Sequence, residues 1–174
     1  QPFALHLLLR LLQSKLPQEC SNAILNWVTG FAAKIRAAHS VDDKAFAHCD
    51  DLETVVVPRF TQTIGTLAFA SCKSLARIEL SDTLKTIGER AFETCGALKN
   101  ISIPRSVESI ASGAFIGCFN LVSVELPPLV TEIRSGTFRY CTGLRRVVLP
   151  PTVTSIGVGA FEDCVSLTEV QQLG

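Results

Sequence analysis

Seven cysteines carry most of the chemical potential in this sequence of 174 residues. Clustered cysteines bind zinc, a cysteine beside a general base is a nucleophile, and paired cysteines form disulfides in oxidising compartments. Six of the seven are instead separated by a constant 23 positions: Cys49, Cys72, Cys95, Cys118, Cys141 and Cys164. Because no Cys-x-x-Cys pair occurs in the sequence, we expect neither a metal site nor any other cofactor.

His48 and Cys49 are adjacent, which raises the possibility of a nucleophile with its base. Neighbouring residues on a turn point in different directions, and Cys49 is simply the first member of the regular series. The acidic residues are scattered, and Gly157-Val158-Gly159 lacks the strand and helix that frame a phosphate-binding loop. We therefore expect a protein that is not an enzyme, with no catalytic residue.

The 23-residue period also positions apolar side chains around each of the six cysteines. A phenylalanine lies three positions before each one, a leucine three positions after, and a valine or isoleucine six positions after. From Leu98, one unit reads Leu-x-x-Ile-x-Ile-Pro-x-x-Val-x-x-Ile-x-x-x-Ala-Phe-x-x-Cys. The first part predicts a short strand that the proline ends, and Ala-Phe-x-x-Cys predicts a helical or 3-10 turn. Gly65, Gly88 and Gly157 predict a bend after the isoleucine.

A single unit is too small to enclose a core, whereas stacked units bring each apolar side chain about 4.8 Å from its copy. The repeat therefore predicts a solenoid over residues 41–174, with a parallel sheet of about six short strands and short turns and bends opposite. Stacked cysteines fall within bridging range, so a disulfide framework is possible. We favour reduced cysteines buried in the core, because their side chains point in parallel and a free thiol packs like a small hydrophobe.

These units resemble the BspA-like class of leucine-rich repeats, whose pattern is Leu-x-x-Ile-x-Ile-Pro followed by Ala-Phe-x-x-Cys. The match runs from about residue 41 to the end, and its departures are local: Thr137 replaces the alanine, Ala111 and Arg134 replace the glycine, and Gln172 replaces an apolar strand residue. The resemblance implies a leucine-rich-repeat solenoid and a non-catalytic binding protein, often displayed on a cell surface as an adhesin.

Residues 1–40 do not follow the repeat and predict a helical N-terminal cap or docking segment. Its first helix would present a leucine-rich stripe for packing or docking, formed by Leu5, Leu8, Leu9 and Leu12. His6 and Arg10 interrupt this stretch, so we expect no membrane span. Residues 16–25 are similar to the opening of an F-box helix, although the later F-box pattern is not recognisable.

The candidate partner-binding residues are polar positions that lie between the inward-facing residues of the strands. On a leucine-rich repeat such positions face the concave side, and simple solvation is the alternative role. The candidates are Arg77, Glu79, Lys99, Asn100, Glu125, Arg145, Arg146 and Glu169. The 16 basic residues balance the 16 acidic ones, which argues against a nucleic-acid partner.

We therefore expect a non-catalytic protein–protein interaction module that binds a protein through its concave face or exposed ends. One alternative is an accessory structural subunit of a large intracellular assembly, docked by the first helix and the open edge of the last strand. Another is an F-box-like adaptor for ubiquitin ligation. The family role places the chain at the cell surface or outside the cell, whereas reduced ladder cysteines favour a cytoplasmic or organellar assembly.

Overall fold

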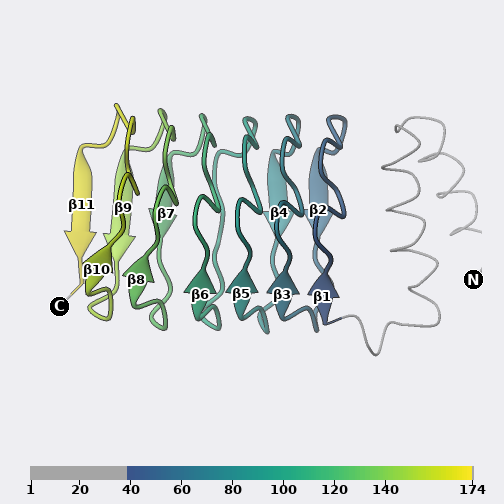
Figure 1. Cartoon of the computed structure of the whole chain (residues 1–174), viewed down its shortest axis with the longest axis horizontal. Coiled ribbons are helices and arrows are strands. Elements are labelled where there is room, and N and C mark those ends of the chain that lie inside the picture. Colours follow the sequence, from purple (N-terminus) through teal and green to yellow (C-terminus); the bar gives the residue numbers. More distant parts are fainter. Residues whose placement is uncertain (1–38, 174) are drawn as a thin grey trace, which may run out of the picture. The chain divides into compact units, whose positions relative to one another are not determined.

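The computed structural model describes residues 39–173, which form six stacked coils of a β-solenoid (Figure 1). Each coil has one cysteine of the 23-residue series, and we number the coils 1 to 6 from Cys49 to Cys164. Two rows of parallel strands run along the stack, and a wall of turns completes each coil. The solenoid expected from the repeat is therefore present.

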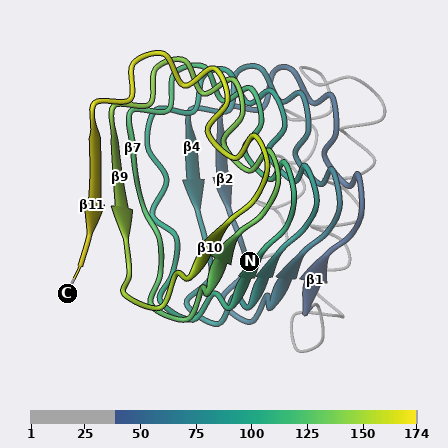
Figure 2. The ribbon, with the colours of Figure 1, turned by 60° about the vertical axis from the view of Figure 1, so that its left-hand side comes forward.

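The strands form a front row and a back row that run in opposite directions in Figures 1 and 2. The front row contains β1 (Ser40–Val41), β3 (Thr63–Ile64), β5 (Thr86–Ile87), β6 (Ser109–Ile110), β8 (Glu132–Ile133) and β10 (Ser155–Ile156). The back row contains β2 (Thr54–Val56), β4 (Arg77–Glu79), β7 (Ser123–Glu125), β9 (Arg146–Leu149) and β11 (Glu169–Gln172). We expected one row of strands with bends opposite, but a two-residue strand in each unit, such as Thr63–Ile64, adds a second row.

In each coil, one segment leads from the front-row strand to the back-row strand, for example residues 42–53 in coil 1. We call this segment the turn wall, and it contains no helix in any described coil. In coil 1, Ala47 donates its N–H to the Lys44 carbonyl at 3.1 Å, and Cys49 donates to the Phe46 carbonyl at 3.2 Å. Lys44 and His48 have left-handed backbones with φ of 57° and 60°, and this interrupts any helical turn. The helical turn predicted from Ala-Phe-x-x-Cys is therefore wrong, because apolar residues three apart here belong to consecutive tight turns.

In the turn wall, a repeated set of backbone hydrogen bonds joins each coil to the next one. Phe92 donates its N–H to the Ala114 carbonyl of the next coil at 2.8 Å, and Thr94 donates to the Ile116 carbonyl at 2.8 Å. Equivalent bonds recur at all five junctions between the six coils. These N–H groups therefore point toward the C-terminal end of the stack, whereas others, such as the Gly88 N–H, donate to the preceding coil, in this case to the Ile64 carbonyl at 2.8 Å.

Glycine at the end of a front-row strand allows two coils to approach closely. A Cβ on Gly88 would lie 2.6 Å from the Gly65 carbonyl carbon, and Gly88 does not have a left-handed backbone. At this position, glycine is thus required for the close approach of neighbouring coils. Ala111 and Arg134 face each other at the junction of coils 4 and 5, where neither residue is glycine, and there β6 and β8 do not pair.

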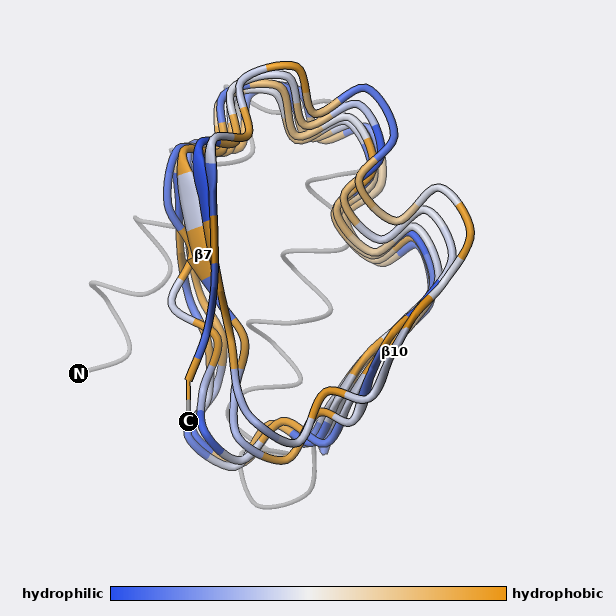
Figure 3. Cartoon of the chain, turned by 90° about the vertical axis from the view of Figure 1, so that its left-hand side faces the viewer, coloured by the Kyte–Doolittle hydropathy of each residue, from blue (hydrophilic) through white to orange (hydrophobic). Residues whose placement is uncertain are grey.

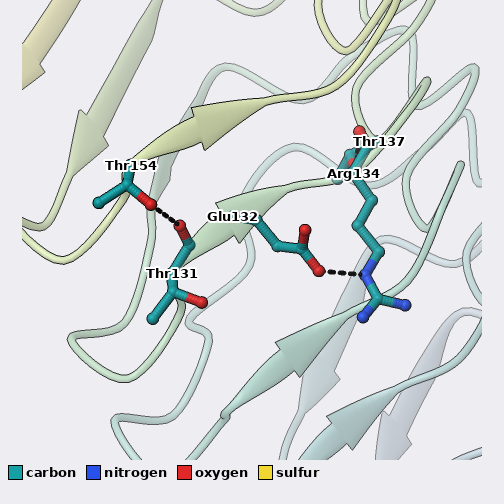
Figure 4. A network of polar contacts seen from close by, with 5 residues as sticks. All are labelled: Thr131, Glu132, Arg134, Thr137 and Thr154. Carbon is teal, nitrogen blue, oxygen red and sulfur yellow. Dashed lines mark hydrogen bonds and ion pairs between the residues drawn. The ribbon is translucent and has the colours of Figure 1, made fainter.

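The side chains near this unpaired junction have local partners (Figure 4). The Thr137 hydroxyl, which replaces an alanine methyl in the core, donates to the Arg134 carbonyl at 2.7 Å. The Arg134 guanidinium bonds to the Glu132 carboxylate at 2.8 Å. Thr154 of coil 6 donates to the Thr131 carbonyl at 3.4 Å, so coils 5 and 6 remain joined. The departures at positions 134 and 137 are therefore accommodated without an unpaired buried hydroxyl.

The core is a set of buried side-chain ladders. Figure 3 shows the two rows of strands and the turn wall around it, seen along the stack. The phenylalanine rings stack nearly parallel from Phe46 to Phe161, with adjacent ring centroids 5.2–5.5 Å apart. Phe69, Phe92, Phe115 and Phe138 are fully buried. The predicted inward positions are thus confirmed, and the intervening strand positions face outward on a rigid support.

Candidate functional site

The cysteine ladder is a structural element that links each coil to the one before it. The Cys72 thiol donates to the Phe46 carbonyl at 3.0 Å, and the Cys95 thiol donates to the Phe69 carbonyl at 3.1 Å. The thiols of Cys118, Cys141 and Cys164 make the same bond. A free thiol that both packs and donates one weak hydrogen bond fits this position.

The electrostatic environment of these thiols opposes nucleophilic chemistry. Burial raises the pKa of Cys72 and Cys141 to about 12, and it also raises the pKa values of Cys95, Cys118 and Cys164. The reactive form of cysteine is the thiolate, which these shifts disfavour at neutral pH. The five ladder thiols from Cys72 to Cys164 are free, as expected, whereas Cys49 is disulfide-bonded, so the expectation of a wholly reduced ladder is wrong for coil 1.

The sequence raised two further kinds of chemistry, a metal site and the adjacent His48 and Cys49. Among residues 39–173, no three histidine, cysteine or acidic side chains come together in a group that would hold a metal ion. His48 has a left-handed backbone at the corner of coil 1 and is exposed, while Cys49 beside it is buried. The two side chains therefore occupy different environments.

The eight candidate partner-binding residues all lie in the back row or directly beside it, and all are exposed. Four of them are already engaged with one another in pairs. Arg77 and Glu79 form an ion pair at 2.5 Å, and Arg146 forms one with Glu169 at 3.2 Å. These pairs leave four candidates without a side-chain ion pair or hydrogen bond among the described residues: Lys99, Asn100, Glu125 and Arg145.

The back row brings these four candidates onto adjacent coils. Asn100 of coil 3 pairs with Ser123 of β7 in an isolated parallel bridge. The Arg145 N–H bonds to the Val122 carbonyl at 2.8 Å, and the Val122 N–H bonds to the Lys99 carbonyl at 2.9 Å. The backbone between coils 3 and 5 is therefore continuous under these side chains, and it holds them at one strand spacing from each other.

The eight candidates do not include the apolar and aromatic side chains that lie next to them. Val56 and Val122 are 56% and 41% exposed on the back row. At the nearby corner, Phe119 is exposed, and the Arg139 guanidinium lies 4.7 Å from the ring centroid of Tyr140. An alignment of the six units at the 23-residue period could have revealed the two aromatic residues. At the positions of Phe119 and Tyr140, most other units have a small or polar residue.

The 23-residue spacing could also have been used to predict ion pairs between adjacent coils, and the sequence analysis did not include them. The pairs Lys73–Asp50, Lys85–Glu108, Arg139–Glu162 and Arg146–Glu169 each join residues 23 positions apart. They connect adjacent coils on the surface, where each contributes at most about 1 kcal/mol. These four ion pairs therefore follow the 23-residue repeat.

Three other predictions concern residues outside the described part of the chain. They are the helical cap of residues 1–40, of which only residues 39 and 40 are described, the F-box-like stretch, and the docking residues Leu5, Leu8, Leu9 and Leu12. Within residues 39–173, none of the chain forms a helix that is both long and apolar enough to cross a membrane.

Residues 39–170 match the model of the BspA type leucine rich repeat region in six copies. The crystal structure of a leucine-rich repeat protein of T. pallidum is similar, with a TM-score of 0.76 and 43% sequence identity. That alignment covers 77% of this chain and 63% of the T. pallidum chain. No curated protein matches the chain at a significant level.

Two further structures share the fold over smaller parts of their own chains. A leucine-rich repeat protein from Eubacterium ventriosum has a TM-score of 0.65 and 27% identity, over 68% of this chain and 32% of that one. A leucine rich cell surface protein from Faecalibacterium prausnitzii has a TM-score of 0.52 and 29% identity, over 75% and 44%. The chain thus spans less than two thirds of the length of each of these three relatives. The family match over residues 39–170, together with the phenylalanine and cysteine ladders, shows that the chain belongs to the BspA-type leucine-rich repeat family.

Proposed function

We propose that this chain is a non-catalytic module that binds a protein partner through the outer face of its back row. The observation that carries the proposal is the contrast between buried ladders and outward positions on the same strands. In β7, for example, Val124 is buried, whereas Glu125 is exposed. The ladders fix the backbone, so the outward side chains are held in place before a partner arrives, which lowers the entropic cost of binding.

The composition of this face suits a protein partner better than a small molecule. Lys99, Glu125 and Arg145 lie on three consecutive coils, and their charged side chains form no ion pair among the described residues. Exposed Val122 lies among them. Charged groups around an apolar patch are typical of interfaces between proteins, where charge directs the partner and apolar area is buried.

The cell surface or the extracellular space is the compartment that we propose. The F. prausnitzii relative is described as a cell surface protein. The disulfide at Cys49 supports the same compartment, because disulfides persist where the environment is oxidising. The free thiols of the ladder do not oppose it, since burial protects them from oxidation.

Charge reversal on the back row tests the proposal. The partner is first captured by cross-linking on intact cells that carry the protein, and its affinity is then measured by surface plasmon resonance. Arg145→Glu combined with Arg146→Glu should weaken binding at least tenfold, mainly by slowing association. The matched control is Arg105→Glu, which changes an exposed arginine between the two rows and should leave affinity unchanged.

A circular dichroism melt of each variant establishes that the fold is retained. Equal affinity of the double variant and the wild-type chain for the captured partner would remove the back row from the interface and refute the proposal.

A further inference from the structure

The corner where coil 4 passes from the turn wall to the back row exposes two apolar side chains that the repeat does not require. Phe119 is 45% exposed and Val122 is 41% exposed. No other coil has an apolar residue larger than alanine at both of these positions. We use the name Phe119 patch for Phe119 and Val122 together with Lys99 of coil 3 and Arg145 of coil 5.

Two glycines leave the Phe119 ring uncovered. A Cβ on Gly96 would lie 3.8 Å from the Cδ2 atom of the ring, and a Cβ on Gly117 would lie 3.5 Å from its Cζ atom. All five other coils have a side chain at the position of Gly96, and all five others have one at the position of Gly117. A side chain at either position would lie against the ring, so glycine at both keeps the ring available for contact.

The backbone that carries Phe119 is held firmly in place. Phe119 donates its N–H to the Gly117 carbonyl at 2.9 Å, and its own carbonyl accepts the Gly143 N–H of coil 5 at 2.9 Å. The Asn120 side-chain amide donates to the Gly96 carbonyl of coil 3 at 2.6 Å. A Cβ on Gly143 would lie 2.6 Å from the Phe119 carbonyl oxygen, so glycine permits this contact. An aromatic residue fixed in this way loses little entropy when it is buried by a partner.

The apolar part of the patch lies between two cations. Lys99 and Arg145 occupy the same repeat position as Val122, one coil before it and one coil after it, and both are exposed. Neither forms an ion pair among the described residues, and residues 111–124 of coil 4 contain no charged side chain. The unpaired carboxylate of Glu125 belongs to a residue three positions along β7 from Val122, about 10 Å away along the strand. The patch is therefore positively charged around an apolar centre.

The charge and spacing of the patch favour an acidic polypeptide as its occupant. The backbones of Lys99 and Arg145 are two strand spacings apart, about 9.6 Å, and three residues of extended chain span about 10 Å. Carboxylates at positions i and i+3 of an extended segment can therefore reach both cations, with an apolar side chain between them. An acidic sugar chain fits less well, because its hydroxyl groups need polar partners, whereas coil 4 presents a phenyl ring and a valine here.

We propose that the Phe119 patch binds an extended acidic segment of the partner protein. Two carboxylates of the segment, three positions apart, pair with Lys99 and Arg145, and a bulky apolar side chain between them packs on Phe119 and Val122. This inference rests on the proposed function, because it names the chemistry of the partner that the back row binds.

Titration of the ¹⁵N-labelled full chain with the peptide Ac-Glu-Phe-Leu-Glu-NH2, followed by NMR, tests the patch. We expect saturable shifts of the Phe119, Val122 and Gly143 amides, with a dissociation constant of about 1 mM or tighter. Phe119→Ser should weaken binding at least tenfold. The matched control is Phe60→Ser, because Phe60 is also exposed, at 56%, and has its own cation, with Arg59 6.0 Å from the ring centroid. This control variant should bind the peptide as the wild-type chain does.

A charge swap separates recognition from any loss of folding. The wild-type chain should not bind Ac-Lys-Phe-Leu-Lys-NH2, whereas Lys99→Glu combined with Arg145→Glu should bind this peptide and lose the acidic one. The absence of shifts at the patch with about 5 mM acidic peptide, or equal binding of both peptides by the wild-type chain, would overturn the proposal. Tighter binding of tetragalacturonate than of the acidic peptide at the same amides would assign the patch to an acidic sugar chain and overturn it as well.

The two proposals can fail separately. If Arg145→Glu combined with Arg146→Glu weakens the captured partner but the acidic peptide does not bind the patch, the back-row interface stands and the acidic segment is refuted. If the peptide binds as expected but the captured partner is unaffected by that double variant, the proposed function is refuted, and the patch remains a site for acidic peptides.

Discussion

Truncation of one phenylalanine inside the stack, Phe92→Ala, tests whether the ring ladder stabilises the solenoid. The Phe92 ring is fully buried, and its centroid lies 5.5 Å from that of Phe69 and 5.3 Å from that of Phe115. Replacement of a buried phenylalanine by alanine costs about 3–5 kcal/mol. We expect the upper part of that range, because the change removes two stacked contacts and leaves a cavity that rigid neighbouring coils cannot fill.

The same truncation at the end of the ladder is the matched control. Phe161 is only partly buried and stacks on one ring, Phe138, at 5.5 Å. Phe161→Ala should therefore cost about 1–2 kcal/mol, since less apolar area leaves water and the surrounding space stays open. Urea unfolding followed by circular dichroism gives both free energies. A cost below about 0.5 kcal/mol for Phe92→Ala, or equal costs for the two variants, would contradict a ladder buried between coils.

Glycine substitution should separate close approach from bending: Gly88→Ala should cost about 1–3 kcal/mol, because its Cβ would lie 2.6 Å from the Gly65 carbonyl carbon. Gly96→Ala, where the nearest atom is 3.8 Å away, should be neutral in the same urea assay, and equal effects would contradict this explanation. The raised pKa values of Cys72 and Cys141, about 12, predict a dependence on pH. An unfolded thiol loses its proton near pH 8.5 while the folded one keeps it, so the free energy of unfolding should be insensitive to these thiols below that pH and should fall as pH rises toward 12. A free energy of unfolding that is constant between pH 8 and 11 would refute the assigned burial. The four buried free thiols, from Cys72 to Cys141, should also resist Ellman's reagent in native buffer and react fully in urea, whereas rapid reaction of Cys95 or Cys118 in the native state would contradict their burial.

The sequence alone was sufficient to predict the repeat, the inward ladders and the outward exposure of the candidate residues. These features depend on side-chain polarity at a fixed spacing, which is visible directly in the residues. The second row of strands was not predicted, because pairs such as Thr63–Ile64 are too short to show alternation, and their pairing depends on the stacked neighbour.

The left-handed turns were missed for a related reason. Positions such as Leu67 and Thr94 adopt φ of 56° and 57°, although neither residue type favours that region. Their backbone N–H groups donate to the next coil, so the hydrogen bonds of the stack impose the conformation. Glycine occupies the equivalent repeat positions only in later coils, for example at Gly113 and Gly117. The sequence of a single coil therefore does not indicate a left-handed backbone there.

The eight candidate residues are exposed and lie in or beside the back row, as the sequence predicts, but the ion pairs among them were not predicted. Arg146 and Glu169 were both candidates, and they form an ion pair with each other across one junction. The sequence contained this information, since the two residues are 23 positions apart. The pairing of Arg77 with Glu79 on one face of β4 follows from the two-residue period of a strand.

Site-specific photo-cross-linking on intact cells tests the central claim most directly. A photoreactive amino acid replaces Lys99 or Glu125 on the back row, and in control variants it replaces Glu132 or Thr154 on the front row; all four positions are exposed. The proposed binding face predicts one protein adduct from both back-row positions and none from either front-row position. An adduct from the front row alone, or no adduct from the back row, would contradict it.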